Sequence, residues 1–438
     1  YYLRQANVME QFLNSCDAPA QPQLPWDLLI VDEVHNLAPN PHGEESELTG
    51  MLRRLTQWFE HRVFITATPH NGFASSFHGL LEILDPAAFT RTSLPTAEQE
   101  ARVPAAAVRR LTAAVRPTGA SPGRVISALA PGFTSRELAL FAAVDGLRRR
   151  LLGWGGLPGP EGRETPALAV EVLGKRLLSS VPAFAASFAA LLEGLEAGPS
   201  AGKGAVARGF RRAGEAGCGE GAADRRWRST ACTIGRWMKN CYPILADDLG
   251  EICDALTALG VNPRQAEPAF PVADARYATL LAWLRSRLHE EKEGGRPERA
   301  LIFTEYRSTL DYLARLLSEQ LHGGKVSILL LHGELREPER VAVVRAFTEN
   351  SARACVLLTT DVGSEGLNLH ASCRLLFHYD IPWNPARLEQ RLGRLDRHGQ
   401  TALVEAFHFS PGTDSAVRLI STVADKVAEC TTGTATRP

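Results

Sequence analysis

Short apolar runs alternate with amphipathic segments in two separate parts of this chain, residues 1–88 and 273–412. The apolar runs have the length of buried strands, and the segments between them have the 3.6-residue spacing of helices. Strands that alternate with helices predict parallel sheets, because a crossover helix joins one parallel strand to the next. We therefore predict an α/β chain with two parallel sheets, whose ligands collect at the carboxyl ends of the strands.

The residues between these two parts, 89–272, have a different pattern. Helical spacing dominates there, and strand signals fade. A stretch rich in glycine and alanine, residues 196–223, interrupts the helices and reads as a mobile loop. We expect a helical insertion between the two sheets and a C-terminal helix over residues 413–438.

Charge and cysteine usage limit the classes of function. The formal net charge is -1, so the chain as a whole is not a basic nucleic-acid binder. A nucleic-acid site must be a local patch, and the candidates are Arg148–Arg150 and the group formed by Arg225, Arg226 and Arg228. The eight cysteines are scattered without CxxC pairs, which indicates reduced thiols and a cytoplasmic protein.

Two further classes of site are not indicated. The spacing of Cys232, Cys241 and Cys253 does not fit an ordinary zinc pattern. No apolar run reaches the ~18 residues that a membrane-spanning helix needs, so we expect no membrane partner.

Two adjacent carboxylates, Asp32 and Glu33, end the first apolar run, in the string "WDLLIVDEVHN". Such a pair suits nucleotide hydrolysis, because Asp32 can hold Mg²⁺ while Glu33 polarises the attacking water. A bare Asp-Glu pair is more often two solvated acids at a strand end. The context favours chemistry, since His35 follows and the second strand ends in hydroxyls, Thr66 and Thr68, that could bridge a nucleotide cleft.

A cationic segment lies near the other end of the chain. In "EQRLGRLDRHGQ", Gln390, Arg394 and Arg397 have helical spacing, which predicts one helix face for the two arginines. Arginine suits phosphate because its planar fork donates two parallel hydrogen bonds and keeps its charge. A solvated basic helix is the alternative for this segment taken alone.

The string "LLTTDVGSEGLNLHAS" precedes that segment and reads as a strand that runs into a glycine-containing loop. Gly363 and Gly366 would let backbone amides approach phosphate groups closely.

Six strings in this order resemble the motifs II, III, IV, IVa, V and VI of the Swi/Snf-type ATPases of helicase superfamily two. They are the DEAH-box-like "VDEVHN", then "ITATPHNG", "LIFTEYRSTLDYL", "LHGELREPER", "LLTTDVGSEGLNLHAS" and "DIPWNPARLEQRLGRLDRHGQ". The chain is most similar to the bacterial RapA/HepA-like branch, over residues 24–425. The resemblance implies two RecA-like domains, the first incomplete, that close on ATP and Mg²⁺ and grip double-stranded DNA. RNA polymerase or phage-defence proteins are further partners that it implies.

The resemblance also implies roles for residues at the matching positions. Asp32 would hold Mg²⁺ through water, Glu33 would be the catalytic base, and His35 would relay the nucleotide state. Thr66 and Thr68 would couple hydrolysis to domain closure.

The second domain would supply the other half of the site. Arg394 and Arg397 would contact the γ-phosphate, with Gln390 and Gly366 at the same nucleotide interface. The residues that would touch the nucleic-acid backbone are Thr304, His332, Gly333, Thr359 and Thr360.

A motor of this kind needs a GxxxxGK(S/T) loop whose amides and lysine hold the phosphates. None precedes Asp32, and the Gly202-Lys203 pair is followed by Gly204 instead of a hydroxyl residue. We therefore expect this chain to be the larger C-terminal part of a longer motor, with the loop in upstream sequence. The chain alone is then expected to hydrolyse ATP poorly or not at all.

Two other readings remain at this point. One is a strand-separating helicase of the same superfamily, although "SEGLNL" and "IPWNP" favour the translocase. The other is a catalytically inactive scaffold that binds nucleic acid. Retention of the Asp32, Glu33, Arg394 and Arg397 side chains argues against the scaffold, whereas the missing loop keeps it open.

Overall fold

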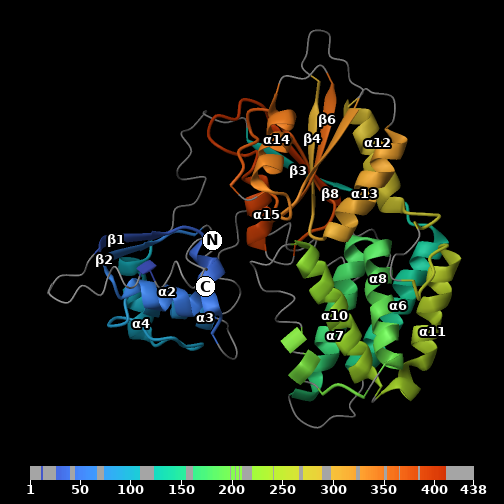
Figure 1. The fold of residues 1–438 in the computed structure, drawn as a ribbon, viewed down its shortest axis with the longest axis horizontal. Coiled ribbons are helices and arrows are strands. Elements are labelled where there is room, and N and C mark those ends of the chain that lie inside the picture. Colours follow the sequence, from blue (N-terminus) through green and yellow to red (C-terminus); the bar gives the residue numbers. More distant parts are fainter. Residues whose placement is uncertain are drawn as a thin grey trace. The chain divides into compact units, whose positions relative to one another are not determined.

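The chain divides into two compact units, residues 1–118 and 119–438, and each is described by itself (Figure 1). The computed structural model describes residues 11–12, 26–39, 45–66, 74–108, 123–153, 161–197, 199–202, 204–206, 208–209, 220–239, 241–265, 270–288, 297–321, 326–349, 353–364, 366–382 and 385–410. The C-terminal helix predicted over 413–438 lies outside these residues, as does most of the loop predicted over 196–223. The four-part division predicted from the sequence stays a proposal.

The first unit is built around two parallel strands. Its elements are β1 (Trp26–Val31), the short 3₁₀ helix η2 (Val34–Leu37), α2 (Glu47–Thr56), β2 (Phe59–Phe64), α3 (Ala74–Leu84) and α4 (Ala97–Ala106). One face of the strands meets η2, α2 and α3 in a small apolar core, which includes Leu52, Leu80 and Ile83. The opposite face carries alternate residues of β1, of which Ile30 is 59% exposed. Alternation of buried and exposed side chains is what a strand covered on one face requires.

The second unit contains a six-stranded parallel sheet in the order β3-β8-β7-β4-β6-β5. Its strands are β3 (Arg124–Leu129), β4 (Arg299–Thr304), β5 (Val326–Leu331), β6 (Ala354–Thr360), β7 (Leu375–His378) and β8 (Val404–Phe409). Every side chain of β4 and β6 is buried. Parallel strands in the middle of a sheet need this, because helices cover both of their faces.

Helices cover the two faces of this sheet in separate layers (Figure 1). They are α12 (Ala275–Leu288), α13 (Arg307–Gln320), α14 (Glu337–Thr348) and α15 (Pro385–Leu392). Ile302 of β4 belongs to the core that α12 and α13 cover, and its neighbour Phe303 belongs to the core with α14 and α15. Successive residues of one strand thus serve opposite faces.

The strand β3 lies within residues 89–272, where strand signals fade in the sequence and a helical insertion rather than part of a sheet is expected. It pairs in parallel with β8 along its whole length, and it forms one edge of the sheet. Its signal in the sequence is weak because it is an edge strand with only partial burial, and Val125 on it is 47% exposed.

A helical block follows β3 in the chain and has an apolar core of its own. It consists of α6 (Ser135–Gly153), α7 (Glu161–Ser179), α8 (Val181–Glu196), α10 (Glu220–Met238) and α11 (Tyr242–Ala258). Helices α8 and α10 cross closely, because Gly194 faces the backbone of α10 and Gly235 faces the backbone of α8. Within the described residues, no helix is long and apolar enough to cross a membrane.

We predict that Gly235→Ala destabilises the second unit by about 1–3 kcal/mol, because the added methyl group would overlap the backbone oxygen of Leu191. Thermal and urea unfolding measure the effect. The matched control is Gly250→Ala on α11, where a Cβ meets nothing within 4 Å. That change is expected to be neutral or to stabilise the helix by about 0.5–1 kcal/mol. Equal effects of the two substitutions would contradict the close helix crossing.

Candidate functional site

The carboxyl ends of the parallel strands bring polar residues together along one edge of the sheet in the second unit. Glu305 follows β4, His332 follows β5, Asp361 follows β6 and Asp380 follows β7. β4 lies between β6 and β7, so later strands of the chain are added to the sheet on both sides of it. Such a reversal point is where open parallel sheets bind ligands.

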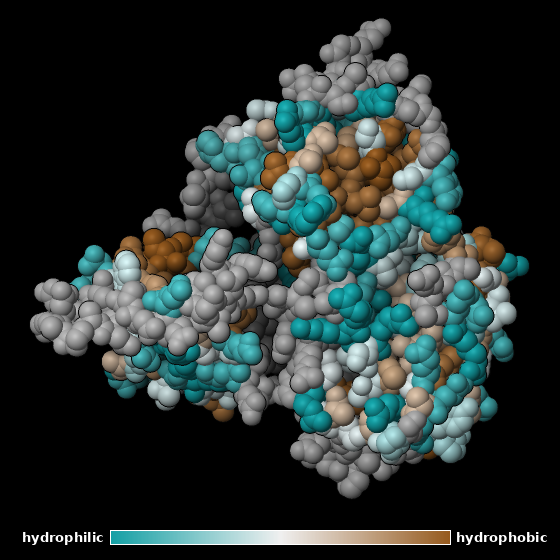
Figure 2. Space-filling view, in the orientation of Figure 1, coloured by the Kyte–Doolittle hydropathy of each residue, from teal (hydrophilic) through white to brown (hydrophobic). Residues whose placement is uncertain are grey.

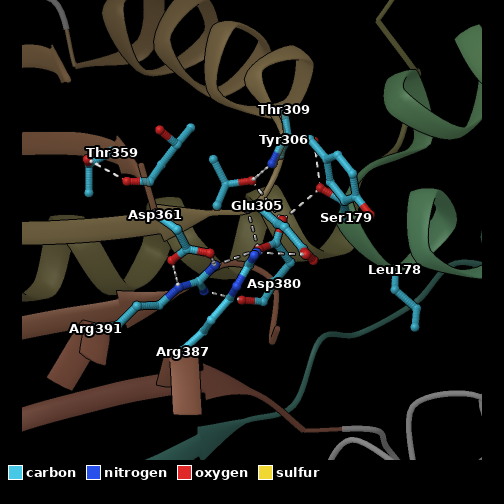
Figure 3. Close-up of polar contacts among 12 residues, drawn as sticks. Leu178, Ser179, Glu305, Tyr306, Thr309, Thr359, Asp361, Asp380, Arg387 and Arg391 are labelled. Carbon is cyan, nitrogen blue, oxygen red and sulfur yellow. Dashed lines mark hydrogen bonds and ion pairs between the residues drawn. The ribbon is translucent and has the colours of Figure 1, made fainter. Parts of the chain in front are cut away.

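Asp380 joins three elements at this edge (Figure 3). Its Oδ2 atom accepts hydrogen bonds from the Thr304 hydroxyl at 2.7 Å and from the Ser179 hydroxyl at 2.8 Å. Its Oδ1 atom accepts one from the backbone N–H of Glu305 at 2.7 Å. The end of β4 and the end of α7 are therefore fixed to the residue that follows β7.

Arg391 of α15 is the buried cation of the edge, with 1% of its surface exposed. Its Nε and Nη2 atoms donate to the two carboxylate oxygens of Asp361 at 2.5 and 3.0 Å. Its Nη1 atom donates to the backbone oxygen of Asp380 at 2.7 Å, and the guanidinium lies 5.2 Å from the centre of the Phe303 ring. Burial opposes the charge, but Asp361 and Asp380 outweigh it and raise the pKa of Arg391 above its ordinary value. The positive charge of Arg391 is therefore balanced by carboxylates of its own domain.

A second arginine of α15, Arg387, lies beside Glu305 (Figure 3). The Nη1 atom of Arg387 lies 3.8 Å from Oε1 of Glu305, and its side chain is 41% exposed. Burial raises the pKa of the Glu305 carboxyl group, and Arg387 acts against that shift. The contact is too long for a firm hydrogen bond, so Arg387 is available to a phosphate that approaches this edge.

The turn after β6 is shaped by its small residues. A Cβ at Gly363 would lie 2.5 Å from the backbone oxygen of Leu331, so β5 and this turn approach each other only because the residue is glycine. The backbone N–H of Gly363 donates to the Thr360 hydroxyl at 3.3 Å. Gly366 is exposed and has a φ of +75°, a conformation that glycine adopts without strain. The turn therefore packs against the end of β5, and the predicted approach of its amides to phosphate stays a prediction.

Three of the five residues expected at nucleic acid are buried. The hydroxyls of Thr304, Thr359 and Thr360 bond within the domain to Asp380 or to backbone groups. These bonds hold the strand ends in place, and the predicted contact of these residues with nucleic acid stays a prediction. His332 and Gly333 are partly exposed and can be reached. Burial and the nearby Arg307 lower the pKa of His332.

The two arginines predicted to share a helix face lie beyond the end of a helix. α15 ends at Leu392, and the following residues form turns in which Arg397 donates from Nε to the backbone oxygen of Gly393 at 2.6 Å. Arg394 is mostly buried, and Gln390 is partly buried within α15. The prediction that one helix carries both Arg394 and Arg397 was wrong. Glycine at 393 favours the end of a helix, and this outweighs the helical spacing of the arginines.

The first unit holds the acidic pair at the end of β1. Asp32 is exposed, and its Oδ1 accepts a hydrogen bond from the backbone N–H of Glu33 at 2.9 Å. Glu33 has the left-handed conformation, with φ 50° and ψ 42°, which is uncommon for a residue other than glycine. Strain of this kind is often found at functional sites.

His35 connects the two strand ends of the first unit. Its Nδ1 atom lies 2.9 Å from the Thr66 hydroxyl and 3.2 Å from Oε2 of Glu33. Thr66 is therefore linked to Glu33 through His35, and its predicted role in coupling stays a prediction. Thr68 lies outside the described residues.

The expected cofactors are ATP and Mg²⁺, and carboxylates are the side chains that could hold the metal ion. Among the described residues no group of three or more metal-binding side chains is found. An exposed carboxylate such as that of Asp32 still suits Mg²⁺, which keeps several waters and takes one or two carboxylates plus phosphate oxygens. Glu33 and Arg397 belong to different units, so their meeting at one triphosphate stays a prediction.

The sequence reasoning missed the residues that organise the edge, namely Arg391, Asp361 and Asp380. A signal was present, because Asp361 directly follows one buried strand and Asp380 lies two residues after another. Nothing in the spacing distinguishes Arg391 from the other arginines of its segment.

Comparisons with known proteins agree with this architecture. Residues 280–399 match the family of the helicase conserved C-terminal domain. Over 113 residues the chain is 34% identical to the uncharacterized ATP-dependent helicase YqhH of Bacillus subtilis, which covers 26% of this chain and 19% of that protein. Over 110 residues it is 34% identical to the RNA polymerase-associated protein RapA of Yersinia enterocolitica, covering 25% and 11%.

A solved structure, the C-terminal part of the Fun30 ATPase domain, covers 69% of this chain and 90% of that chain, at 16% identity and a TM-score of 0.39. The chain spans 19% or less of the two curated relatives' length. Residues 280–399 are a helicase C-terminal domain, and the resemblance to helicase superfamily two, with RapA among the relatives, is confirmed. The predicted α/β fold with parallel sheets is confirmed as well.

We predict that Arg391→Met destabilises the second unit by about 3–5 kcal/mol, because it leaves the Asp361 carboxylate without its buried partner. Urea unfolding measures the loss. The control is Arg345→Met, whose side chain pairs on the surface with Glu349 and is expected to cost less than about 1 kcal/mol. A small loss at Arg391 would show that the buried pair adds little.

We predict that stability falls as the pH drops below about 6.5, with His378 as a principal cause. This imidazole is buried beside Arg391 and His408, and neither ring nitrogen has a hydrogen-bond partner. Burial, with those two neighbours, lowers its pKa well below the ordinary 6.5. The unfolded chain therefore binds the proton first as the pH falls, so stability is full above about pH 6.5 and is lost below it.

At about pH 5 this single group costs up to about 2 kcal/mol relative to neutral pH. Urea midpoints at the two pH values measure the slope, and His378→Leu is expected to flatten it. The exposed His61→Leu serves as the control and should leave the slope unchanged. His332 and His408, whose pKa values are also lowered by burial, contribute to the remaining slope. An unchanged slope in the His378 variant would contradict the assignment.

Proposed function

We propose that this chain acts in an ATP-dependent motor that moves along double-stranded DNA without separating its strands. One observation carries the proposal. The helicase C-terminal domain places Glu305, His332, Asp361 and Asp380 on one edge of a parallel sheet, directly beside the arginine segment that begins in α15. An edge with reachable arginines and closely approachable backbone suits phosphate groups.

The first unit would supply the hydrolytic half. Asp32 would hold a Mg²⁺ ion, which when bound screens the charge of the phosphates, and Glu33 would accept a proton from the attacking water. The His35 contact with Thr66 at 2.9 Å would tie the position of that base to the end of β2. Arg394 and Arg397 would approach the γ-phosphate from the second unit.

The nucleic acid would lie along the backbone-rich turns of the second unit. His332 and Gly333 are partly exposed at the end of β5, and they would contact phosphate and sugar rather than base edges. Contacts of this kind carry no sequence information, which a motor that passes any sequence requires. RapA, named as an RNA polymerase-associated protein, is one of the relatives, so RNA polymerase is a candidate partner.

The direct test compares triplex displacement with the unwinding of a forked duplex. Both assays use ATP and the 438 residues joined to a segment that carries a GxxxxGK(S/T) loop, which the chain itself does not contain. A translocase displaces the third strand and leaves the fork paired. Unwinding of the fork would instead favour a strand-separating helicase, and loss of both activities would favour a scaffold.

We predict that Glu33→Gln lowers ATP hydrolysis in this joined protein by about 10²–10⁴-fold, while nucleotide binding changes little. Arg397→Ala should act in the same way from the second unit, with a loss of about 10³–10⁵-fold. Single-turnover hydrolysis and equilibrium nucleotide titration separate the two effects. The exposed residues Glu60 and Arg345 provide matched controls, as Glu60→Gln and Arg345→Ala. Lost binding with unchanged hydrolysis per bound nucleotide would show that the roles are wrongly assigned.

A further inference from the structure

The two arginine clusters that the sequence offers as nucleic-acid patches differ in whether carboxylates pair with their guanidinium groups. In the first cluster, Arg148 and Arg149 both pair with Asp145, at 2.8 and 3.0 Å. Arg150 pairs with Asp248. Carboxylates of the same helical block therefore neutralise most of this cluster, and it offers little net charge to a polyanion.

The second cluster lies on α10 and differs in this respect. Arg225 is exposed and Arg228 is partly exposed, and their spacing of three residues puts them on one face of the helix. In the part of the chain that the structure describes, neither guanidinium pairs with a carboxylate. Ser229, exposed beside them, adds a hydroxyl donor to the same surface.

The nearest acid of α10 is already engaged elsewhere. Asp224 accepts from Nη1 of Arg176 at 2.6 Å and from the backbone N–H of Ser308 at 2.8 Å. Ser308 lies in the first turn of α13, just after the carboxyl end of β4. These contacts compensate the charge of Asp224. They also bring the face of α10 that carries Arg225 and Arg228, here called the arginine face, next to the candidate site.

The arginine face stands on a rigid support. Trp227 and Trp237 of α10 are buried in the core of the helical block, and Gly235 lies against the backbone of α8. In Figure 1, α10 lies at the margin of the helical block on the same side as α15. Figure 2 shows hydrophilic residues over the region where the sheet and the helical block meet.

We infer that Arg225 and Arg228 bind backbone phosphates of duplex DNA next to the carboxyl edge of the sheet. Arg225 and Arg228 lie three residues apart, so the helix rises roughly 4.5 Å between them. Two guanidiniums held on one face of a rigid helix, neither paired with a carboxylate among the described residues, suit neighbouring backbone phosphates and read no sequence. The inference rests on the proposed function and assigns it a second contact surface, on the helical block.

The test measures binding of the purified 438-residue chain to a short labelled duplex by fluorescence anisotropy, between about 50 and 200 mM salt. The variant Arg225→Gln/Arg228→Gln is expected to bind more weakly and to reduce the slope of log K against log salt by about 2, because each lost phosphate contact removes about 0.9. The variant Arg225→Lys/Arg228→Lys keeps both charges and should retain most of the slope. Circular dichroism and thermal unfolding verify that the variants are folded.

The matched control is Arg136→Gln/Arg285→Gln, which removes the same charge from exposed positions on α6 and α12. Its slope should equal that of the wild type. If the wild type binds and the α10 variant keeps the full slope, the inference fails while the proposed function stands. If the wild type binds no duplex at all, both fail. Binding of an acidic peptide that the α10 variant loses, with duplex binding unchanged, would assign the surface to a protein partner and overturn the inference.

Discussion

The buried guanidinium of Arg391 is the interaction on which the second unit depends. A charge inside a protein is tolerated only when it is paired and fully hydrogen-bonded, and Asp361 and Asp380 meet this need from the ends of two different strands. Because β6, β7 and α15 all meet at this one cation, the turns around it have little freedom. The buried ion pairs of Arg391 therefore fix the position of the sheet edge at which a ligand would bind.

A second polar connection ties the helical block to that edge. Ser179 at the end of α7 donates to Asp380, and the Arg176–Asp224 pair reaches the first turn of α13 through Ser308. Buried polar networks whose members are satisfied specify one arrangement of their elements. The helical block therefore presents its surfaces in a set orientation to the carboxyl edge, which is why an arginine face on α10 can act together with it.

The two units contribute different chemistry to the proposed motor. The first carries exposed acids on a short left-handed turn, with His35 between Glu33 and Thr66. The second carries cations and closely packed backbone. In the proposed motor the two sets would act together, the acids on water and the cations on phosphate.

The sequence by itself determined most strands, most helices and the edge at which chemistry gathers, because periodicity and the residues after buried strands are local properties. It also carried the resemblance to helicase superfamily two, through ordered strings of which the later ones lie in or near the matched residues 280–399. Only the tertiary structure decided which arginine is buried, that the hydroxyls of Thr359 and Thr360 face inward, and that β3 joins the sheet. It alone shows that Arg150 pairs with Asp248, whereas Arg225 pairs with no carboxylate among the residues that the structure describes. Charge pairing and burial depend on residues far apart in the chain, and no local spacing records them.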